Sequence, residues 1–359
     1  MIYLPPFFQT GQASAPPLPA FLRSYPSAVI NYRWLDPSSD GHGDGSNSSQ
    51  LQWPTPIHDT LFGYQWILDN LSPPGSERRD IYVYGSYLGA SLAASLALTE
   101  SQQDQRMAVR GLLTYNGIYN WTMFLPDHPI HTRKSVADAL DETPYAEGSF
   151  FHYLRNTMPV LFPSPSGLFD PFASPSIFFR DPGLWVPDDF TSSIAGSAMS
   201  RAIDELSGSS SDDEGSQAST ASTTWNLKPP PKSYLTFPPL RSTLKIPETL
   251  LLHETPPPPT YPGGKRRRKS SAPKPKKRPK ILNNFEGQAT ELANLMRRSV
   301  EKYELGDRAG ECADGEGLEE PEHVRRVQME DVGAVEGDGQ LGERGQGVAA
   351  AWLRERIGQ

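Results

Sequence analysis

The stretch Asp80–Leu98 (DIYVYGSYLGASLAASLAL) constrains the fold of this chain more than any other segment. It begins with β-branched and aromatic residues, which suit a buried strand, so we expect a strand over Asp80–Tyr84. The next five residues, Gly85–Gly89, begin and end with glycine and predict a tight turn. The run of Ala, Leu and Ser that follows has little side-chain bulk and predicts a helix packed closely against a sheet. This order of elements indicates an α/β protein.

The same order resembles the nucleophile elbow of the α/β-hydrolases, in particular those of the esterase and lipase type. In that motif, G-x-S-x-G, a serine stands at the tip of a strained turn between strand and helix. When Gly85 and Gly89 are matched to the two glycines, Tyr87 takes the place of the serine. Ser86 lies one position too early, so we expect its side chain to point elsewhere. The resemblance therefore implies an elbow whose nucleophile has been replaced.

Further apolar and amphipathic segments resemble the same family in their order along the chain. They predict a mostly parallel sheet that is flanked by helices and covered by a cap. In the family a hairpin of strands precedes the first of these segments, so we expect the N-terminal strands to be missing here. The expected strands are Ile2–Leu4, Ala28–Trp34, Val109–Tyr115, Leu244–His253 and Val324–Val335, and the expected helices are Trp53–Leu71, Arg133–Leu140, Phe150–Met158, Ala195–Leu206, Phe285–Tyr303 and Val348–Ile357.

Shifts in composition divide the chain into core segments and inserts. The core is expected to comprise residues 1–125, a strand segment at 233–255, and residues 281–359. Residues 126–206 are rich in aromatic residues and proline and predict the cap. The Ser-rich acidic segment 207–232 and the Pro-rich basic segment 256–280 are too polar to bury, so we expect both to be disordered.

Aromatic residues of the expected cap have two interpretations. They could line a hydrophobic pocket that holds an apolar small molecule, or they could bury the cap against the sheet. We favour burial, because aromatic residues are most often part of a core. The residues are Phe150, Phe151, Tyr153, Phe162, Phe169, Phe172, Phe178, Phe179 and Trp185.

The resemblance implies three more catalytic features, and none of them is intact in this sequence. The family's catalytic histidine follows the last strand, but all seven histidines of this chain lie at or before His323. The loop after the first strand supplies oxyanion N–H groups in the family, whereas Pro5 and Pro6 have no N–H. Glu254 is the candidate for the catalytic acid, although a solvated loop end is the simpler interpretation. We therefore expect no intact set of catalytic residues.

A compact cationic block, Lys265–Lys280, interrupts the family pattern. It contains ten basic residues and no acidic residue, in a chain with 34 Lys and Arg against 42 Asp and Glu. Such a block predicts an exposed loop, since unpaired like charges cannot be buried. Three interpretations stay open: a bipartite signal for a nuclear-import receptor, a site for polyanions, or a merely solvated loop. The basic residues are Lys265, Arg266, Arg267, Arg268, Lys269, Lys274, Lys276, Lys277, Arg278 and Lys280.

Other sequence patterns predict no cofactor and no metal site. The chain has no P-loop, dinucleotide or His-Glu-x-x-His motif, and its single cysteine, Cys312, excludes a Cys-based metal cluster. No stretch is long and apolar enough to cross a bilayer, and Met1–Phe8 does not resemble a signal peptide, so we expect an intracellular protein, cytoplasmic or nuclear.

Three functional hypotheses follow from these observations. The one we favour is a catalytically degenerate α/β-hydrolase-like protein with a binding or scaffold role. The alternative is an active carboxylic-ester or thioester hydrolase that uses unconventional residues. A third is a protein that binds nucleic acid or a membrane surface through Lys265–Lys280.

Overall fold

The computed structural model describes residues 1–6, 17–34, 52–125, 128–131, 145, 149–162, 164–181, 236–255, 282–305, 321–333 and 340–358. Within these residues, six strands form one sheet in the order β2-β1-β3-β4-β5-β6, and every neighbouring pair is parallel. The strands are β1 (Ile2–Leu4), β2 (Ala28–Val29), β3 (Arg79–Ser86), β4 (Met107–Tyr115), β5 (Glu248–His253) and β6 (Val327–Asp331). This arrangement confirms the predicted α/β class and the parallel sheet.

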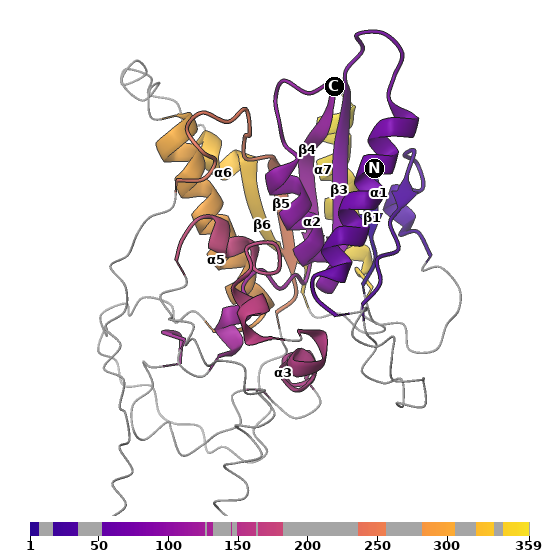
Figure 1. Ribbon diagram of the computed structural model, residues 1–359. Helices are drawn as coiled ribbons and strands as arrows, with labels where there is room; N and C mark the ends of the chain where they lie inside the picture. Colours follow the sequence, from indigo (N-terminus) through magenta and orange to yellow (C-terminus); the bar gives the residue numbers. More distant parts are fainter. Residues whose placement is uncertain are drawn as a thin grey trace, which may run out of the picture.

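Helices cover both faces of the sheet, as Figure 1 shows. One face carries α1 (Thr55–Leu71), α2 (Leu88–Thr99) and α5 (Phe285–Ser299), and the other carries α7 (Glu343–Ile357) with the short η1 (Ala20–Leu22). Alternate residues of β3 meet the two layers, because neighbouring side chains of a strand point to opposite faces. Tyr82 packs edge-on against Trp352 of α7, with ring centroids 6.1 Å apart, whereas Gly85 lies against α2.

The remaining elements lie beside the sheet or beyond its ends. Helix α3 (Phe150–Leu161) lies beyond the carboxyl ends of the strands (Figure 1), where its first residue contacts Tyr87. Helix α5 continues into a π-helical turn, η6 (Val300–Glu304), and α6 (Glu322–Arg326) leads directly into β6. Three short 3-10 helices complete the described elements: η3 (Trp121–Phe124), η4 (Pro165–Phe169) and η5 (Pro175–Phe178).

Helix α2 shows why its sequence is rich in small residues. It is buried on all sides from Leu88 to Leu98, so bulky side chains would separate it from the sheet. Its serines are satisfied inside the core: Ser91 donates to the carbonyl oxygen of Ile118, and Ser95 donates to that of Phe172 at 2.7 Å. The predicted strand, turn and helix of Asp80–Leu98 are therefore confirmed, with the strand running two residues longer at its end, to Ser86.

Two expected strands are shorter in the structure than the sequence predicted. The strand expected over Ala28–Trp34 ends at Val29, because the chain turns toward α1 and the Arg33 N–H donates to Asp59 Oδ2 at 2.8 Å. The strand expected over Leu244–His253 begins only at Glu248, because Pro247 has no N–H for the ladder.

The prediction for Val324–Val335 was wrong in its first half. Residues Glu322–Arg326 form the helical turn α6, and the strand occupies only Val327–Asp331. Arg326 stabilises this turn through ion pairs with Glu322, one turn earlier, and with Glu304 of η6. A pattern of alternating apolar residues does not reveal such a pairing.

The predicted helices are confirmed where the structure describes them. Helices α1, α3, α5 and α7 match the expected segments, although α7 begins earlier than expected, at Glu343. The predicted helices at Arg133–Leu140 and Ala195–Leu206, and the segments 207–232 and 256–280, lie outside the described residues. No helix in the described part of the chain has the length and apolar character needed to span a membrane.

Gly89 permits the closest approach between helix and sheet. A Cβ atom there would overlap the carbonyl oxygen of Leu4 and lie 2.6 Å from that of Pro5. We expect Gly89→Ala to lower the free energy of unfolding by about 3 kcal/mol, because backbone atoms cannot move aside cheaply. Chemical denaturation measures this change. Gly347→Ala in α7 is the control, since nothing lies within 4 Å of its Cβ position; it should leave stability unchanged or raise it by up to about 1 kcal/mol. Equal effects of the two substitutions would contradict the packing assigned to Gly89.

Candidate functional site

The turn after β3 has the backbone expected of a strained elbow. Tyr87, between the end of β3 and the start of α2, has φ 51° and ψ −116°. A bulky residue rarely adopts a positive φ, so the surrounding packing must hold it in place. Gly85 supplies part of that packing, because a Cβ there would lie 2.7 Å from the carbonyl carbon of Gly89 and 2.8 Å from Cβ of Ala93.

The elbow lies where the order of the strands reverses. Strand β2 lies on one side of β1, and the chain then crosses to the other side of β1 to form β3. The carboxyl ends of β1 and β3 therefore flank a topological switch point. In parallel α/β sheets, ligands bind in the crevice at such a point. Leu4 ends β1 and Tyr87 follows β3, so the switch point lies between them. We therefore take this edge of the sheet as the candidate functional site.

The side chain of Tyr87 is enclosed by other aromatic rings. It is 7 % exposed and makes edge-to-face contacts with Phe150 of α3, Tyr115 of β4 and Phe285 of α5, with ring centroids 5.1, 5.6 and 5.6 Å away. Its hydroxyl accepts a hydrogen bond from Asn116 Nδ2 at 3.3 Å. The ring thus fills the end of the sheet and is held by both apolar and polar contacts.

Asn116 is the centre of a polar network across the carboxyl ends of β3, β4 and β5. It is fully buried, has φ 50°, and its Oδ1 accepts from the backbone N–H of Glu254 at 3.0 Å. The Tyr115 hydroxyl donates to Glu254 Oε2 at 3.4 Å. Burial raises the pKa of Glu254, although hydrogen bonds from Asn116 and Tyr115 counteract this. Glu254 is thus a half-buried, hydrogen-bonded residue directly after β5.

Burial is also the main reason that the pKa of Tyr115 is raised above its ordinary value. Tyr87 and the Glu254 carboxylate raise it further, because each disfavours a phenolate next to it. The phenol of Tyr115 is therefore a hydrogen-bond donor at neutral pH and not a nucleophile.

Ser86 lies on the other side of the strand, as expected for the residue before the elbow. It is 3 % exposed and hydrogen-bonds the stacked side chains of Tyr3 and Tyr84, whose ring centroids are 5.4 Å apart. Burial raises the pKa of Tyr3 to about 12, while the hydrogen bond with Ser86 opposes the shift. The Ser86 hydroxyl is thus hydrogen-bonded to these two tyrosines and not directed toward the elbow.

The loop after β1 presents carbonyl oxygens to the elbow. Those of Leu4 and Pro5 are the atoms that approach Gly89 most closely. The Tyr32 hydroxyl donates to the Pro5 oxygen at 2.7 Å and so fixes this loop. An oxyanion hole needs N–H donors in this position, so the observed backbone cannot stabilise a negative charge through Pro5.

Two of the histidines that the structure describes pair with groups away from the elbow. His131 Nε2 pairs with the Met123 carbonyl at 2.8 Å, and His152 lies 3.4 Å from Asn156 on α3. His253, the last residue of β5, is 4 % exposed, and its Nδ1 has no hydrogen-bond partner. In register beside it is Asp331, whose pKa is lowered by a hydrogen bond from Thr255 and, to a smaller extent, by His253. These pairings do not provide Tyr87 or Ser86 with a general base.

A second buried polar cluster joins α5 to the loop after β4. Glu291 is 6 % exposed; it accepts two hydrogen bonds of 3.2 Å from Asn120 and forms an ion pair with Arg180. Gln288 accepts from the backbone of Asn120 at 2.8 Å. Sequence analysis missed this cluster, although polar residues on the apolar face of an amphipathic helix are a usable signal. The cluster positions the loop that follows Asn116.

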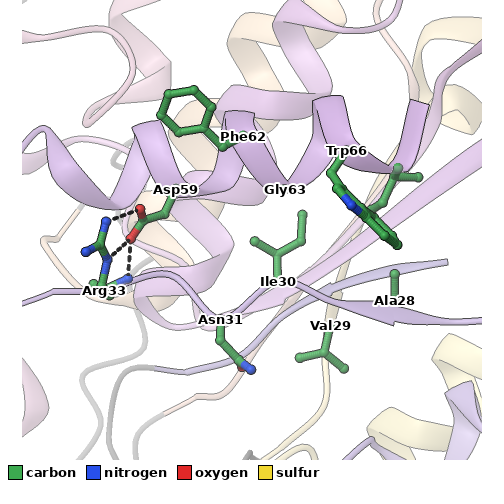
Figure 2. Close-up of a pocket in the computed structure, with 10 residues that line it drawn as sticks. Ala28, Val29, Ile30, Asn31, Arg33, Asp59, Phe62, Gly63 and Trp66 are labelled. Carbon is green, nitrogen blue, oxygen red and sulfur yellow. Dashed lines mark hydrogen bonds and ion pairs between the residues drawn. The ribbon is translucent and has the colours of Figure 1, made fainter. Parts of the chain in front are cut away.

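Two surface pockets stand out, and neither is lined by Tyr87. One lies between β2 and α1 (Figure 2), and the other involves Pro238, Tyr303 and Arg326. The cap aromatics that the structure describes pack on one another and on the core. The ring centroid of Phe172 lies 5.5 Å from that of Phe178, and the ring centroid of Phe151 lies 4.9 Å from that of Phe285 in α5. Burial, the interpretation that we favoured, is what these contacts show; Trp185 lies outside the described residues. No cluster of metal-binding side chains occurs in the described ranges.

The cationic residues of Lys265–Lys280 also lie outside the described residues, so the interpretations of that block remain predictions. No protein-family model, curated protein or solved structure matches this chain.

Asn116 provides a test of the polar network. We expect Asn116→Ala to lower the free energy of unfolding by about 3 kcal/mol, because it leaves a buried N–H unpaired and puts alanine at positive φ. Asn116→Gly loses the same hydrogen bonds but removes the backbone strain. Its free energy of unfolding should therefore fall by about 1 kcal/mol less than that of Asn116→Ala. Thermal and chemical denaturation measure both changes. A fully stable Asn116→Ala variant would show that the network does not hold the elbow.

His128 predicts a dependence of stability on pH. Burial, with Arg180 and His131 nearby, lowers its pKa to about 3, against about 6.5 in an unfolded chain. Between these values the unfolded state binds more protons, so stability falls as the pH is lowered. The loss should be about 2 kcal/mol between pH 6.5 and pH 5, and His128→Asn should remove it. Urea titrations at the two pH values measure the free energy of unfolding of the wild type and of His128→Asn. An equal loss of stability in both proteins would contradict the prediction.

Proposed function

We propose that this chain is a catalytically degenerate α/β-hydrolase-like protein with a binding or scaffold role. Three observations support the hydrolase-like part: the parallel strand order, the positive φ of Tyr87 between a strand and a helix, and glycines two residues to either side. The order is compatible with an α/β-hydrolase sheet whose elbow follows β3. The spacing of these features is that of G-x-S-x-G, with Tyr87 in place of serine.

The observation that carries the loss of catalysis is the enclosure of Tyr87. Rings of Phe150, Tyr115 and Phe285 surround it on three sides, and Asn116 donates to its hydroxyl. An acyl group bound at the elbow would need the space that these rings fill. Loss of single members of a catalytic triad already reduces rates by several orders of magnitude. We therefore propose that the protein binds a partner or ligand and does not turn over a substrate at Tyr87.

The alternative, a hydrolase with unconventional residues, rests on one observation. Glu254 has a raised pKa and lies in a hydrogen-bonded chain with Tyr115 and Asn116 at the elbow. A carboxylate with a raised pKa can act as a general base in a buried site. The same hydrogen bonds, however, engage the hydroxyl groups of Tyr115 and Tyr87, and a reaction would have to break them.

The two proposals differ in the turnover of short and medium acyl nitrophenyl esters and thioesters. We expect the full chain to release nitrophenol from the esters, and thiol from the thioesters, no faster than Tyr87→Phe, Ser86→Ala and Glu254→Gln do. Turnover by the wild type that Tyr87→Phe or Glu254→Gln abolishes would reverse the proposal. Circular dichroism of each variant excludes loss of the fold as the cause.

A further inference from the structure

A groove runs along the edge of the sheet, between β2 and helix α1 (Figure 2). This edge groove has a volume of about 340 Å³. Two large side chains of α1 border it, Phe62 at 74 % exposed and Trp66 at 59 %, and Val29 of β2 is 38 % exposed. Three of the eight large apolar side chains exposed in the described residues thus meet at this place. Contiguous apolar surface of this kind marks interaction sites.

The strand that borders the groove has one free edge. The N–H groups of Ala28 and Ile30 donate to β1, at Met1 O and Tyr3 O. Because successive N–H groups of a strand point to opposite sides, that of Val29 points away from β1. It has no hydrogen-bond partner among the described residues. Unpaired backbone groups at a sheet edge are a template for another strand.

The helix and the strand together form a slot of fixed shape. Gly63 lets α1 lie directly on Ile30, since a Cβ at Gly63 would be 2.9 Å from Ile30 Cγ2. Figure 2 shows Ile30 pointing toward the helix and Val29 pointing away from it, with Phe62 and Trp66 on either side of Gly63. A strand paired with β2 would therefore place every second side chain against these rings.

One end of the groove carries the ion pair of Arg33 and Asp59. Arg33 uses Nε and one terminal nitrogen to bind both oxygens of Asp59, at 2.9 and 2.8 Å. Its other terminal nitrogen, Nη1, has no partner among the described residues, and its side chain is 68 % exposed. By contrast, the side chain of Asp59 is only 15 % exposed. This end of the groove therefore offers the remaining N–H groups of Arg33 as hydrogen-bond donors to an acidic group.

We propose that the edge groove binds an extended segment of a partner protein by strand addition to β2. The segment has apolar side chains at alternate positions, which contact Phe62 and Trp66, and an acidic side chain beside Arg33. The backbone bonds select an extended chain, the rings select the alternation, and Arg33 selects the acid. This inference goes beyond the loss of catalysis, and it does not depend on the chemistry at Tyr87.

A displayed library of short random peptides tests this binding. We expect peptides selected on the full chain to alternate apolar and polar residues and to carry Asp or Glu at one end. The selected peptides are then synthesised with a fluorescent label, and fluorescence anisotropy gives their affinities. Replacement of the acid by Lys, or N-methylation of alternate backbone nitrogens, should weaken binding at least about fivefold. No selected peptide, or peptides without alternation or acid, would overturn the proposal.

Variants of the protein locate the site. Val29→Pro removes the outward N–H at an edge position that tolerates proline, and Trp66→Ser removes one ring. Each should weaken peptide binding at least about fivefold, whereas Leu240→Ser, which changes a leucine 80 % exposed elsewhere, should leave it unchanged. Thermal unfolding confirms that each variant is folded. Equal affinities for all variants would overturn the assignment of the groove. A dimer that Trp66→Ser dissociates would assign the groove to a second copy and would also overturn the proposal. Ester turnover by the wild type would affect only the proposed function.

Discussion

The contact between α2 and the loop after β1 is the constraint on which the rest of the structure depends. Gly89 brings the first turn of α2 against the carbonyl oxygens of Leu4 and Pro5, and Gly85 brings β3 against the same turn. Between these two close approaches, Tyr87 has a φ of 51°. One close backbone contact thereby joins β1, β3 and α2 and sets the position of the elbow at the switch point of the sheet.

The polar groups around the elbow stabilise this geometry. Asn116 tolerates positive φ, which few residues do, and its amide joins Tyr87 to the start of the loop after β5. Glu254 and Tyr115 satisfy each other nearby. The polar groups at these strand ends thus bond to one another and to the phenol of Tyr87.

Much of this fold could be predicted from sequence, and the failures have physical causes. Gly85, Gly89 and the run of small residues predicted the strand, the turn and the buried helix, because those residue types are required by close packing. The ends of β2 and β6 could not be predicted, since they depend on partners distant in sequence, Asp59 for Arg33 and Glu304 for Arg326. The same holds for Asn116, whose importance comes from loops that only the folded sheet brings together.

Labelling with an alkyl fluorophosphonate, mapped by mass spectrometry of the digested protein, tests the central claim most directly. This reagent modifies hydroxyl groups that a site has activated as nucleophiles. Because Tyr87 is enclosed by aromatic rings and Ser86 is hydrogen-bonded away from the elbow, we expect no adduct on either residue of the folded chain. A stoichiometric adduct on Tyr87 or Ser86 that disappears on unfolding would show an activated nucleophile and would contradict it.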